Sequence, residues 1–465
     1  MLNLKNKLLT TVAFLFGAGL AMAQDSGPLI DLLVKKGVVN DQEAEELRAE
    51  LVKDFAANTP AGKLNLGSTV TGFRLTGDIR IRYQYDNEVA NFASPTTVGP
   101  NNDRSRYRYR FRFGPTVSFS RNWTAGFRLE TANGATSTND DFGGNAPAPF
   151  TGSTAFAKDG NVAYIGQVYV QYASSNWYFA DRADFRVGKH AHTFFTPGVN
   201  GFWIDTDINF EGLSEDLTFN DVGMKGWNLT LRGGQYLLAA NSRTARKAAG
   251  SFLNTPSTMW VGQAEYSSIK LVENNPYGTR IAPTIVAFTA PEVTGFIVNS
   301  EVNNFDNLVS FILPIEHTIM MGGKPLAFYA TYGMNFQGAS RANRLYSTST
   351  TALVFGAASG NPKDYDTMYN AGFRYGSLRN AGDWQLTGEY RSVESGAYSS
   401  LLLDSDFNGG RLNGKGYIFS LAYNWTDAIG TTATFFSSKA IDKTGPASLG
   451  FNKADVLQID LTAKF

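Results

Sequence analysis

The most constraining feature of this sequence is a strict alternation of apolar and charged residues in its first third. Arginine occupies every second position from residue 106 to residue 112, and each of these arginines is followed by an aromatic residue: Tyr107, Tyr109, Phe111 and Phe113. The same period of two runs through residues 73–83. Because successive side chains of a β-strand point to opposite faces, each segment predicts a strand with one apolar and one cationic face. A water-soluble sandwich would turn the arginines to solvent, whereas a membrane barrel would turn them to its lumen.

Composition narrows the fold class. Charged residues make up 18% of the chain, below the roughly 25% of soluble domains. No stretch reaches about 18 consecutive apolar residues, which excludes membrane-spanning helices. The balance of 41 basic and 41 acidic residues argues against a nucleic-acid binder, and the absence of Cys excludes disulfides and cysteine chemistry. A secreted β protein or a transmembrane β-barrel remains.

The length of the connections favours the barrel. About sixteen alternating segments follow one another from residue 73 to the end of the chain, and counts of 14 or 18 also fit. The weakest segments are residues 207–217, which are acidic, and residues 308–317, which contain Pro314. Long and short connections alternate, as expected for outer loops and periplasmic turns. The sequence therefore predicts an all-β, antiparallel transmembrane barrel over residues 58–465.

Two segments precede the predicted barrel. Residues 1–23 combine Lys5 and Lys7 with a short apolar run and a small-residue cleavage pattern, which predicts a secretory signal peptide. Residues 24–57 show helical spacing and predict a short periplasmic α-helical hairpin. Eight acidic and four basic residues give that arm a net charge of −4. The arm could be a plug or cap on the barrel, or residues 28–54 could mediate self-association or contact the cell wall.

Four short segments carry a family resemblance. They are residues 73–80 (FRLTGDIR), residues 186–189 (RVGK), residues 209–213 (NFEGL), and the alternating last strand that ends at Phe465. An alternating final strand with a terminal aromatic looks like the assembly signal of bacterial outer-membrane proteins. Together the segments resemble bacterial outer-membrane porins, in particular the putative porin family, with likeness to general and phosphate-selective porins. The resemblance implies a water-filled, homotrimeric pore in the outer membrane.

The inward-facing cations are the candidate pore lining. Residues 74–112 hold eight arginines and four acidic residues, a net charge of +4. The predicted lining residues are Arg74, Arg80, Arg82, Arg106, Arg108, Arg110, Arg112, Arg128, Arg186 and Lys189. Such a wall would attract anions. Alternatively, acidic loop residues neutralise it and create a transverse field, or the arginines have no role in selectivity. The third outer loop is the expected constriction, with Asp205 and Asp207 facing the arginines.

Enzymatic and metal-binding functions find little support. His190 and His192 share a strand face, but no further His or Cys lies nearby, so both are expected to be loop or rim residues rather than metal ligands. Two acidic pairs, Asp140 with Asp141 and Asp404 with Asp406, are expected in outer loops as solvated groups or weak calcium ligands. We therefore expect no catalytic residues, cofactor, metal site or nucleic-acid partner.

Two functional classes remain. The first is an outer-membrane porin for passive diffusion of small hydrophilic solutes and ions, with anion preference as one option. The second is a structural protein whose N-terminal helices tether the outer membrane to the cell wall. Channel conductance separates the two.

Overall fold

The computed structural model describes residues 42–44, 46, 69–90, 101–131, 136–142, 163–239, 257–272, 275–289, 297–298, 301–302, 308–338, 365–441 and 451–465. The chain divides into two units, Met1–Ser68 and Thr69–Phe465. In the first unit only residues 42–44 and 46 are described; they are helical, and Ala44 is buried. The expected signal peptide and most of the expected helical arm, including its proposed contact segment at residues 28–54, lie outside the described residues and stay predictions. Within the described part, no helix is long and apolar enough to cross a membrane.

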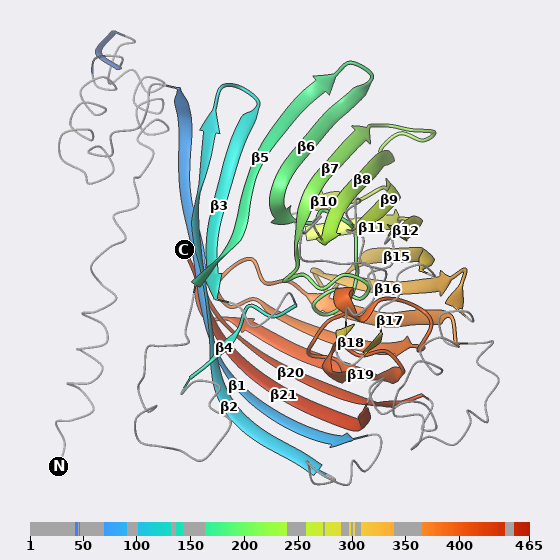
Figure 1. Ribbon diagram of the computed structural model, residues 1–465. Helices are drawn as coiled ribbons and strands as arrows, with labels where there is room; N and C mark the ends of the chain where they lie inside the picture. Colours follow the sequence, from blue (N-terminus) through green and yellow to red (C-terminus); the bar gives the residue numbers. More distant parts are fainter. Residues whose placement is uncertain are drawn as a thin grey trace, which may run out of the picture. The chain divides into compact units, whose positions relative to one another are not determined.

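The second unit is a closed antiparallel β-barrel (Figure 1). Among the described residues, its wall has sixteen strands, which confirms the expected count. They are β1 (Val70–Ala90), β2 (Asn101–Phe119), β3 (Trp123–Thr131), β5 (Ala163–Trp177), β6 (Ala180–Ala191), β7 (Asn209–Phe219), β8 (Asn228–Ala239), β9 (Ser257–Ser267), the interrupted strand β11 (Asn275–Ile281) and β12 (Thr284–Thr289), β15 (Val309–Met321), β16 (Lys324–Asn335), β17 (Thr367–Gly376), β18 (Trp384–Val393), β19 (Gly414–Asn424), β20 (Ile429–Ala440) and β21 (Phe451–Lys464). Each strand pairs with the next, and β21 pairs with β1 to close the ring.

Four short strands belong to the connections. β4 (Asp140–Asp141) pairs with β2, and β10 (Lys270–Val272) pairs with β11. β13 (Ile297–Val298) and β14 (Glu301–Val302) form a separate two-stranded sheet. The alternation of long and short connections places the long loops at one end, which we take as the outer end.

Pro314 is accommodated in β15 because it lies opposite the interruption between β11 and β12. Its carbonyl accepts a hydrogen bond from the Ala282 N–H at 3.0 Å, but proline has no N–H to return the bond. The Ala282 carbonyl instead accepts from the Thr284 hydroxyl at 2.8 Å. The missing ladder bond is thereby replaced locally, and the strand continues past the proline.

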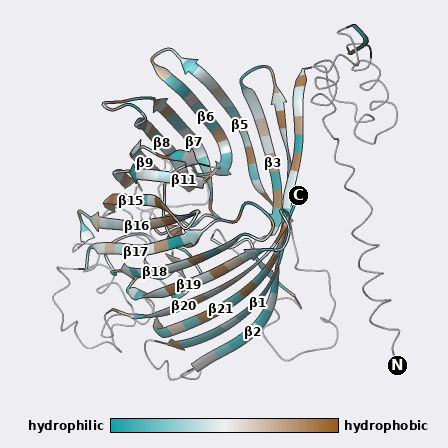
Figure 2. Ribbon diagram, turned by 180° about the vertical axis from the view of Figure 1, so that it is seen from behind, coloured by the Kyte–Doolittle hydropathy of each residue, from teal (hydrophilic) through white to brown (hydrophobic). Residues whose placement is uncertain are grey.

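The two faces of the wall differ as the alternation predicts. On β2, Tyr107 is 61% exposed on the outer face, whereas Arg108 is 4% exposed on the inner face. Ile79 and Ile81 of β1 are exposed on the same outer face as Tyr107. Figure 2 shows hydrophobic and hydrophilic residues alternating along the strands. An apolar outer face around a closed barrel is the arrangement that faces lipid.

Two long loops fold into the barrel. Loop L3 (residues 192–208) joins β6 to β7, and loop L7 (residues 394–413) joins β18 to β19. Their buried side chains, among them Trp203 and Tyr398, form a hydrophobic cluster with inward-facing residues of strands between β7 and β18. A second cluster joins Phe407 of L7 to β19, β20 and β21. The lumen is therefore partly filled, with L7 reaching across it (Figure 1).

Candidate pore lining and constriction

The candidate site begins with an arginine ladder, which we define as Arg80, Arg82, Arg106, Arg108, Arg110 and Arg112 on the inner face of β1 and β2. In the β1–β2 register, Arg80 lies opposite Arg110, and Arg82 lies opposite Arg108. Like charges in directly opposed cross-strand positions destabilise a sheet. The ladder therefore requires acidic partners from elsewhere.

Those partners come from both near and distant parts of the chain. Arg82 donates two hydrogen bonds to the Asp460 carboxylate of β21, at 2.7 Å and 2.9 Å. Asp78 of β1 accepts from Arg110 at 2.8 Å and from Arg112 at 2.6 Å. The ladder also forms ion pairs with Asp86, Asp141, Asp207 and Asp406. Most of the cationic charge is thus compensated within the wall and the loops.

Arg80 is the least compensated residue of the ladder. Its nearest described carboxylate is that of Asp460, at 3.8 Å, and Arg82 already holds that group in two hydrogen bonds. The shortest contact of Arg80 is to a neutral acceptor, the side-chain oxygen of Asn139, at 2.6 Å. The residual positive charge of the ladder is therefore concentrated at Arg80.

The remaining predicted cations are distributed differently. Arg128 pairs with Glu130 at 2.6 Å, and Arg186 pairs with Asp184 at 3.2 Å. Arg74 is exposed near the start of β1.

The expectation that Lys189 lines the pore was wrong. Lys189 pairs across the sheet with Glu211 at 3.2 Å, on the same outer face as the exposed Val187 and Leu213. Lys189 is three positions from the inward-facing Arg186, and an odd separation in a strand reverses the face.

The two predicted acidic residues of the constriction have separate surroundings. Asp207 faces the ladder, 3.8 Å from both Arg110 and Arg112, and accepts a hydrogen bond from the Thr138 hydroxyl at 3.0 Å. Asp205 is buried between the two loops, where its N–H donates to the Leu402 carbonyl of L7 at 2.8 Å. The sequence predicted that both residues face the arginines, but of the two only Asp207 does so.

L7 and β4 supply acidic residues that the sequence predicted to be exposed to solvent. Asp406 lies 3.4 Å from Arg82, and Asp404 lies 3.2 Å from Arg391 of β18. Asp141 of β4 pairs with Arg108 at 2.8 Å, and Asp140 accepts from the Tyr109 hydroxyl at 3.2 Å. The expectation of solvated loop acids was thus wrong. The apolar run Leu401–Leu403 was a signal in the sequence that L7 packs inside.

Glu389 and Arg391 of β18 hold the tip of L3. Glu389 accepts hydrogen bonds from the Val199 N–H at 2.8 Å and from Arg391 at 2.6 Å. Arg391 also donates to the Val199 carbonyl and, at 3.2 Å, to Asp404 of L7. One buried ion pair thereby fixes both loops to the same strand.

The loop carboxylates, which lie outside the membrane-spanning strands, titrate differently from one another. Burial raises the pKa of Asp205 to about 9, and the neighbouring Asp404 carboxylate acts in the same direction. Burial, followed by the Asp406 carboxylate, raises the pKa of Asp404 to about 7. Burial opposes ionisation of Asp406 as well, but the guanidiniums of Arg82 and Arg108 hold its pKa below the ordinary value. Asp406 therefore stays ionised at neutral pH.

A polar cavity of about 270 Å³, which we call the passage, lies beside the ladder. Arg80, Arg82 and Arg110 line it, together with Val199 and Asn200 from L3. Its other lining includes the hydroxyl residues Ser420, Thr431, Thr432, Thr434 and Thr462. The passage therefore offers hydrogen-bonding groups, guanidiniums and carboxylates to a hydrated solute.

His190 is buried rather than located at a rim. Its Nε2 lies 3.4 Å from the Ser214 hydroxyl, which in turn bonds to the Tyr236 hydroxyl at 2.7 Å. His192 packs near the rings of Phe194 and Phe210. Among the residues described, no cluster of His, Cys, Asp or Glu could hold a metal ion.

The chain is similar to several solved structures at low sequence identity. No curated protein matches the chain. Among solved structures, the chain is similar to Pseudomonas putida OprB, with 12% identity, a TM-score of 0.47, and coverage of 85% of this chain and 94% of that one. It is also similar to Salmonella typhi OmpF in complex with daunomycin, with 10% identity, a TM-score of 0.43, and coverage of 84% and 97%.

The family assignment comes from the sequence. The family model described as "Putative porin" matches residues 35–236 and 327–465. Family membership and a closed barrel with an apolar outer face together indicate an outer-membrane channel. Because the match extends over most of the chain, this protein belongs to the putative porin family.

Proposed function

We propose that this porin admits small hydrophilic solutes and ions by passive diffusion along the passage beside the arginine ladder. The observation that carries the proposal is the division of the lumen. Apolar side chains of L3 and L7 fill one part, while guanidinium, carboxylate, amide and hydroxyl groups line the passage beside the ladder. A lining of this kind favours hydrated solutes over apolar ones.

The ladder supports a transverse field with a weak preference for anions. Ion pairs compensate most of its guanidiniums, so a strongly anion-attracting wall is not expected. Arg80 borders the passage, and its nearest carboxylate among the described residues is that of Asp460 at 3.8 Å. We propose that Arg80 is the group that gives anions an advantage. We include Arg82 and Arg110 in the same lining, and assign the other ladder arginines chiefly to holding the wall and loops together.

Single-channel recording in a planar bilayer tests the proposal. The refolded protein should give stable conductance steps that increase with salt concentration, and heat-unfolded protein should give none. A correctly folded barrel that conducts no ions would overturn the channel function and favour the structural tether. Reversal potentials in a salt gradient should show a small excess of anion over cation permeability.

We propose a homotrimer as the assembly, on the basis of the resemblance to porins. Native mass spectrometry in a neutral detergent should show three copies per complex. A single copy at all protein concentrations would contradict this assembly without affecting the channel proposal.

A further inference from the structure

A row of three lysines crosses the outer face of the barrel at the ends of adjacent strands. Lys415 of β19 lies directly opposite Lys439 of β20, which lies directly opposite Lys453 of β21. Directly opposed residues share a face, and Lys415 lies two positions from Tyr417, which is 55% exposed on the outer side. The lysine row therefore points away from the lumen. Such a row is unfavourable by itself, because its charges repel.

Among the described residues, an acidic group compensates one of the three charges. Lys453 pairs with Asp455 at 2.5 Å. Within the described part of the chain, neither Lys415 nor Lys439 forms an ion pair. Among the described residues, three lysines and one carboxylate give this surface a net charge of +2.

Neighbouring tyrosines mark the depth of the row in the membrane. Tyr332, Tyr369, Tyr390 and Tyr417 occupy the outer face of the consecutive strands β16 to β19, and the rings of Tyr390 and Tyr417 lie 5.0 Å apart. Tyrosine girdles of this kind form where a barrel meets the membrane–water interface. Lys415 lies two residues beyond Tyr417 toward L7, which is roughly 7 Å along the strand. The lysines are therefore at the level of lipid headgroups at the outer end.

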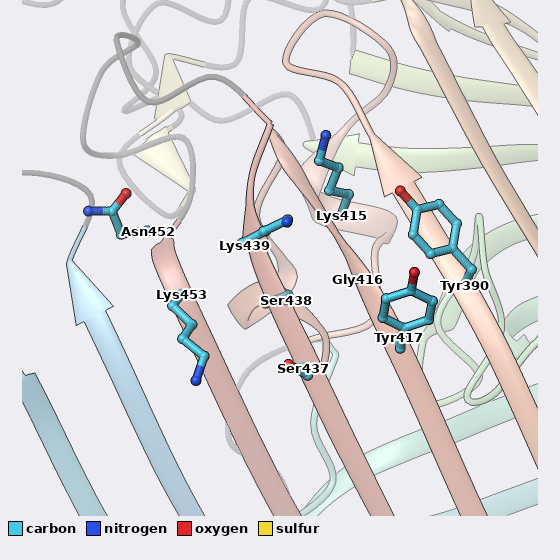
Figure 3. Close-up of a pocket in the computed structure, with 9 residues that line it drawn as sticks. All are labelled: Tyr390, Lys415, Gly416, Tyr417, Ser437, Ser438, Lys439, Asn452 and Lys453. Carbon is cyan, nitrogen blue, oxygen red and sulfur yellow. The ribbon is translucent and has the colours of Figure 1, made fainter.

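The row borders a groove. The groove has a volume of about 570 Å³ and is lined by the three lysines together with Tyr390, Tyr417 and Ser437. Figure 3 shows the amine of Lys439 pointing toward the strand that carries Lys415, the amine of Lys415 pointing away from the two tyrosine rings, and Lys453 pointing along its own strand. The groove thus combines ammonium groups, hydroxyl groups and aromatic faces.

We propose that this groove binds the phosphate headgroup of an anionic lipid of the outer leaflet. The phosphate would lie between Lys415 and Lys439 and relieve their mutual repulsion. The acyl chains would extend toward the membrane centre over the exposed Phe419 and Leu421 of β19. We choose a lipid as the occupant because the lysines lie just outside the tyrosine girdle, and an apolar outer face begins on the other side of that girdle. Acyl chains can pack on that face, whereas a free phosphate would gain nothing from it.

Native mass spectrometry in a neutral detergent tests the proposal with dioleoyl phosphatidic acid as the probe. The wild-type barrel should bind phosphatidic acid in preference to dioleoyl phosphatidylcholine. Each lysine near an anionic lipid surface should strengthen binding roughly fivefold. The double variant Lys415→Gln/Lys439→Gln should therefore bind phosphatidic acid about 25-fold more weakly than the wild type. Lys189→Gln is the matched control, because Lys189 also lies on the outer face but is paired with Glu211; its affinity should equal that of the wild type. Heat-modifiable gel mobility confirms that each variant is folded.

Three results would overturn the proposal. Equal phosphatidic acid affinity in the wild type and the folded double variant would mean that these lysines bind no lipid phosphate. Full displacement of the lipid by an equal concentration of inorganic phosphate would mean a free-anion site. A change in the number of copies per complex in the double variant, with lipid binding unchanged, would identify the row as a contact between protein copies.

Discussion

Arg80 and Arg108 show how two neighbouring arginines of one ladder can have different roles. Arg108 is 4% exposed and donates to the Asp141 carboxylate at 2.8 Å. Arg80 borders the passage and its nearest described carboxylate lies at 3.8 Å. The field that a passing ion meets depends on charge that is both uncompensated and accessible. Selectivity should therefore depend on Arg80 more than on the number of arginines.

We predict that Arg80→Gln lowers the anion-to-cation permeability ratio more than Arg108→Gln does. The effect should be largest at low salt, since the Debye length falls from about 30 Å at 0.01 M to about 3 Å at 1 M. Reversal potentials in a salt gradient measure the ratio. Equal changes in the two variants would show that compensation by Asp141 does not matter.

A second prediction at the residue scale concerns the outer face of β2. Phe111→Arg places a charge against lipid, and near the bilayer midplane this should lower the free energy of unfolding by about 2–4 kcal/mol. Arg110→Gln on the inner face should cost less, because Arg112 still pairs with Asp78 at 2.6 Å. Urea titration of the barrel in detergent micelles measures both. A larger loss in Arg110→Gln would contradict this assignment of the two faces.

At the scale of elements, strands were predictable and loop positions were not. Alternation depends only on neighbouring residues, so it identified every wall strand that the structure describes, including β15 despite Pro314. The acidic partners of the ladder depend on contacts such as Arg82 with Asp460, which are 378 positions apart. No local pattern encodes such a register. The sequence did not predict the burial of L7, because a long connection by itself indicates an outer loop exposed to solvent.

The Arg391 anchor gives an element-scale prediction. Arg391→Met should release the tip of L3 and leave Glu389 and Asp404 buried without their cation. Losing one partner of a buried pair costs roughly 3–5 kcal/mol. Because the weakened anchor should let L3 move in the lumen, we expect noisier or larger conductance steps. Arg374→Met is the control, since Arg374 is 36% exposed and pairs with Glu316 away from the loops. Unchanged conductance in a folded Arg391→Met barrel would show that L3 does not limit the passage.

The contact between L3 and L7 should weaken as pH rises. Burial, reinforced by the Asp404 carboxylate, raises the pKa of Asp205 to about 9, and burial with Asp406 raises that of Asp404 to about 7. Both exceed the roughly 3.9 of an unfolded Asp, so the native state holds extra protons between about pH 4 and pH 9. Stability therefore falls as pH rises through that window.

Thermal unfolding at pH 5, 7 and 9 measures this dependence. The unfolding midpoint should decrease toward pH 9, and Asp205→Asn should flatten the decrease, because an amide keeps the hydrogen-bond acceptor without ionising. A midpoint that increases with pH in the wild type would contradict the prediction.

At the scale of the whole barrel, β1 and β21 close the ring along their length, and this seam ends in one tightly packed contact. Gly77 of β1 exchanges two backbone hydrogen bonds with Phe465, at 2.8 Å and 3.0 Å. A Cβ at Gly77 would lie 2.5 Å from the Arg112 carbonyl oxygen and 2.6 Å from the Phe465 ring. Gly77→Val should therefore reduce the fraction of barrel that migrates as folded on a semi-native gel. Gly262→Val of β9 is the control, because no atom lies within 4 Å of a Cβ added there. Equal folded fractions would show that the seam tolerates extra volume.

The pairing of β1 with β21 also determines when the barrel can be finished. The wall strands from β2 to β20 have both partners close by in sequence, but β1 must wait for β21, more than three hundred residues later. Contacts of such long range form slowly, and until they form the sheet has two unpaired edges. A newly exported chain would therefore expose two unpaired strand edges for most of its assembly. It would be most vulnerable to aggregation just before the last strand pairs.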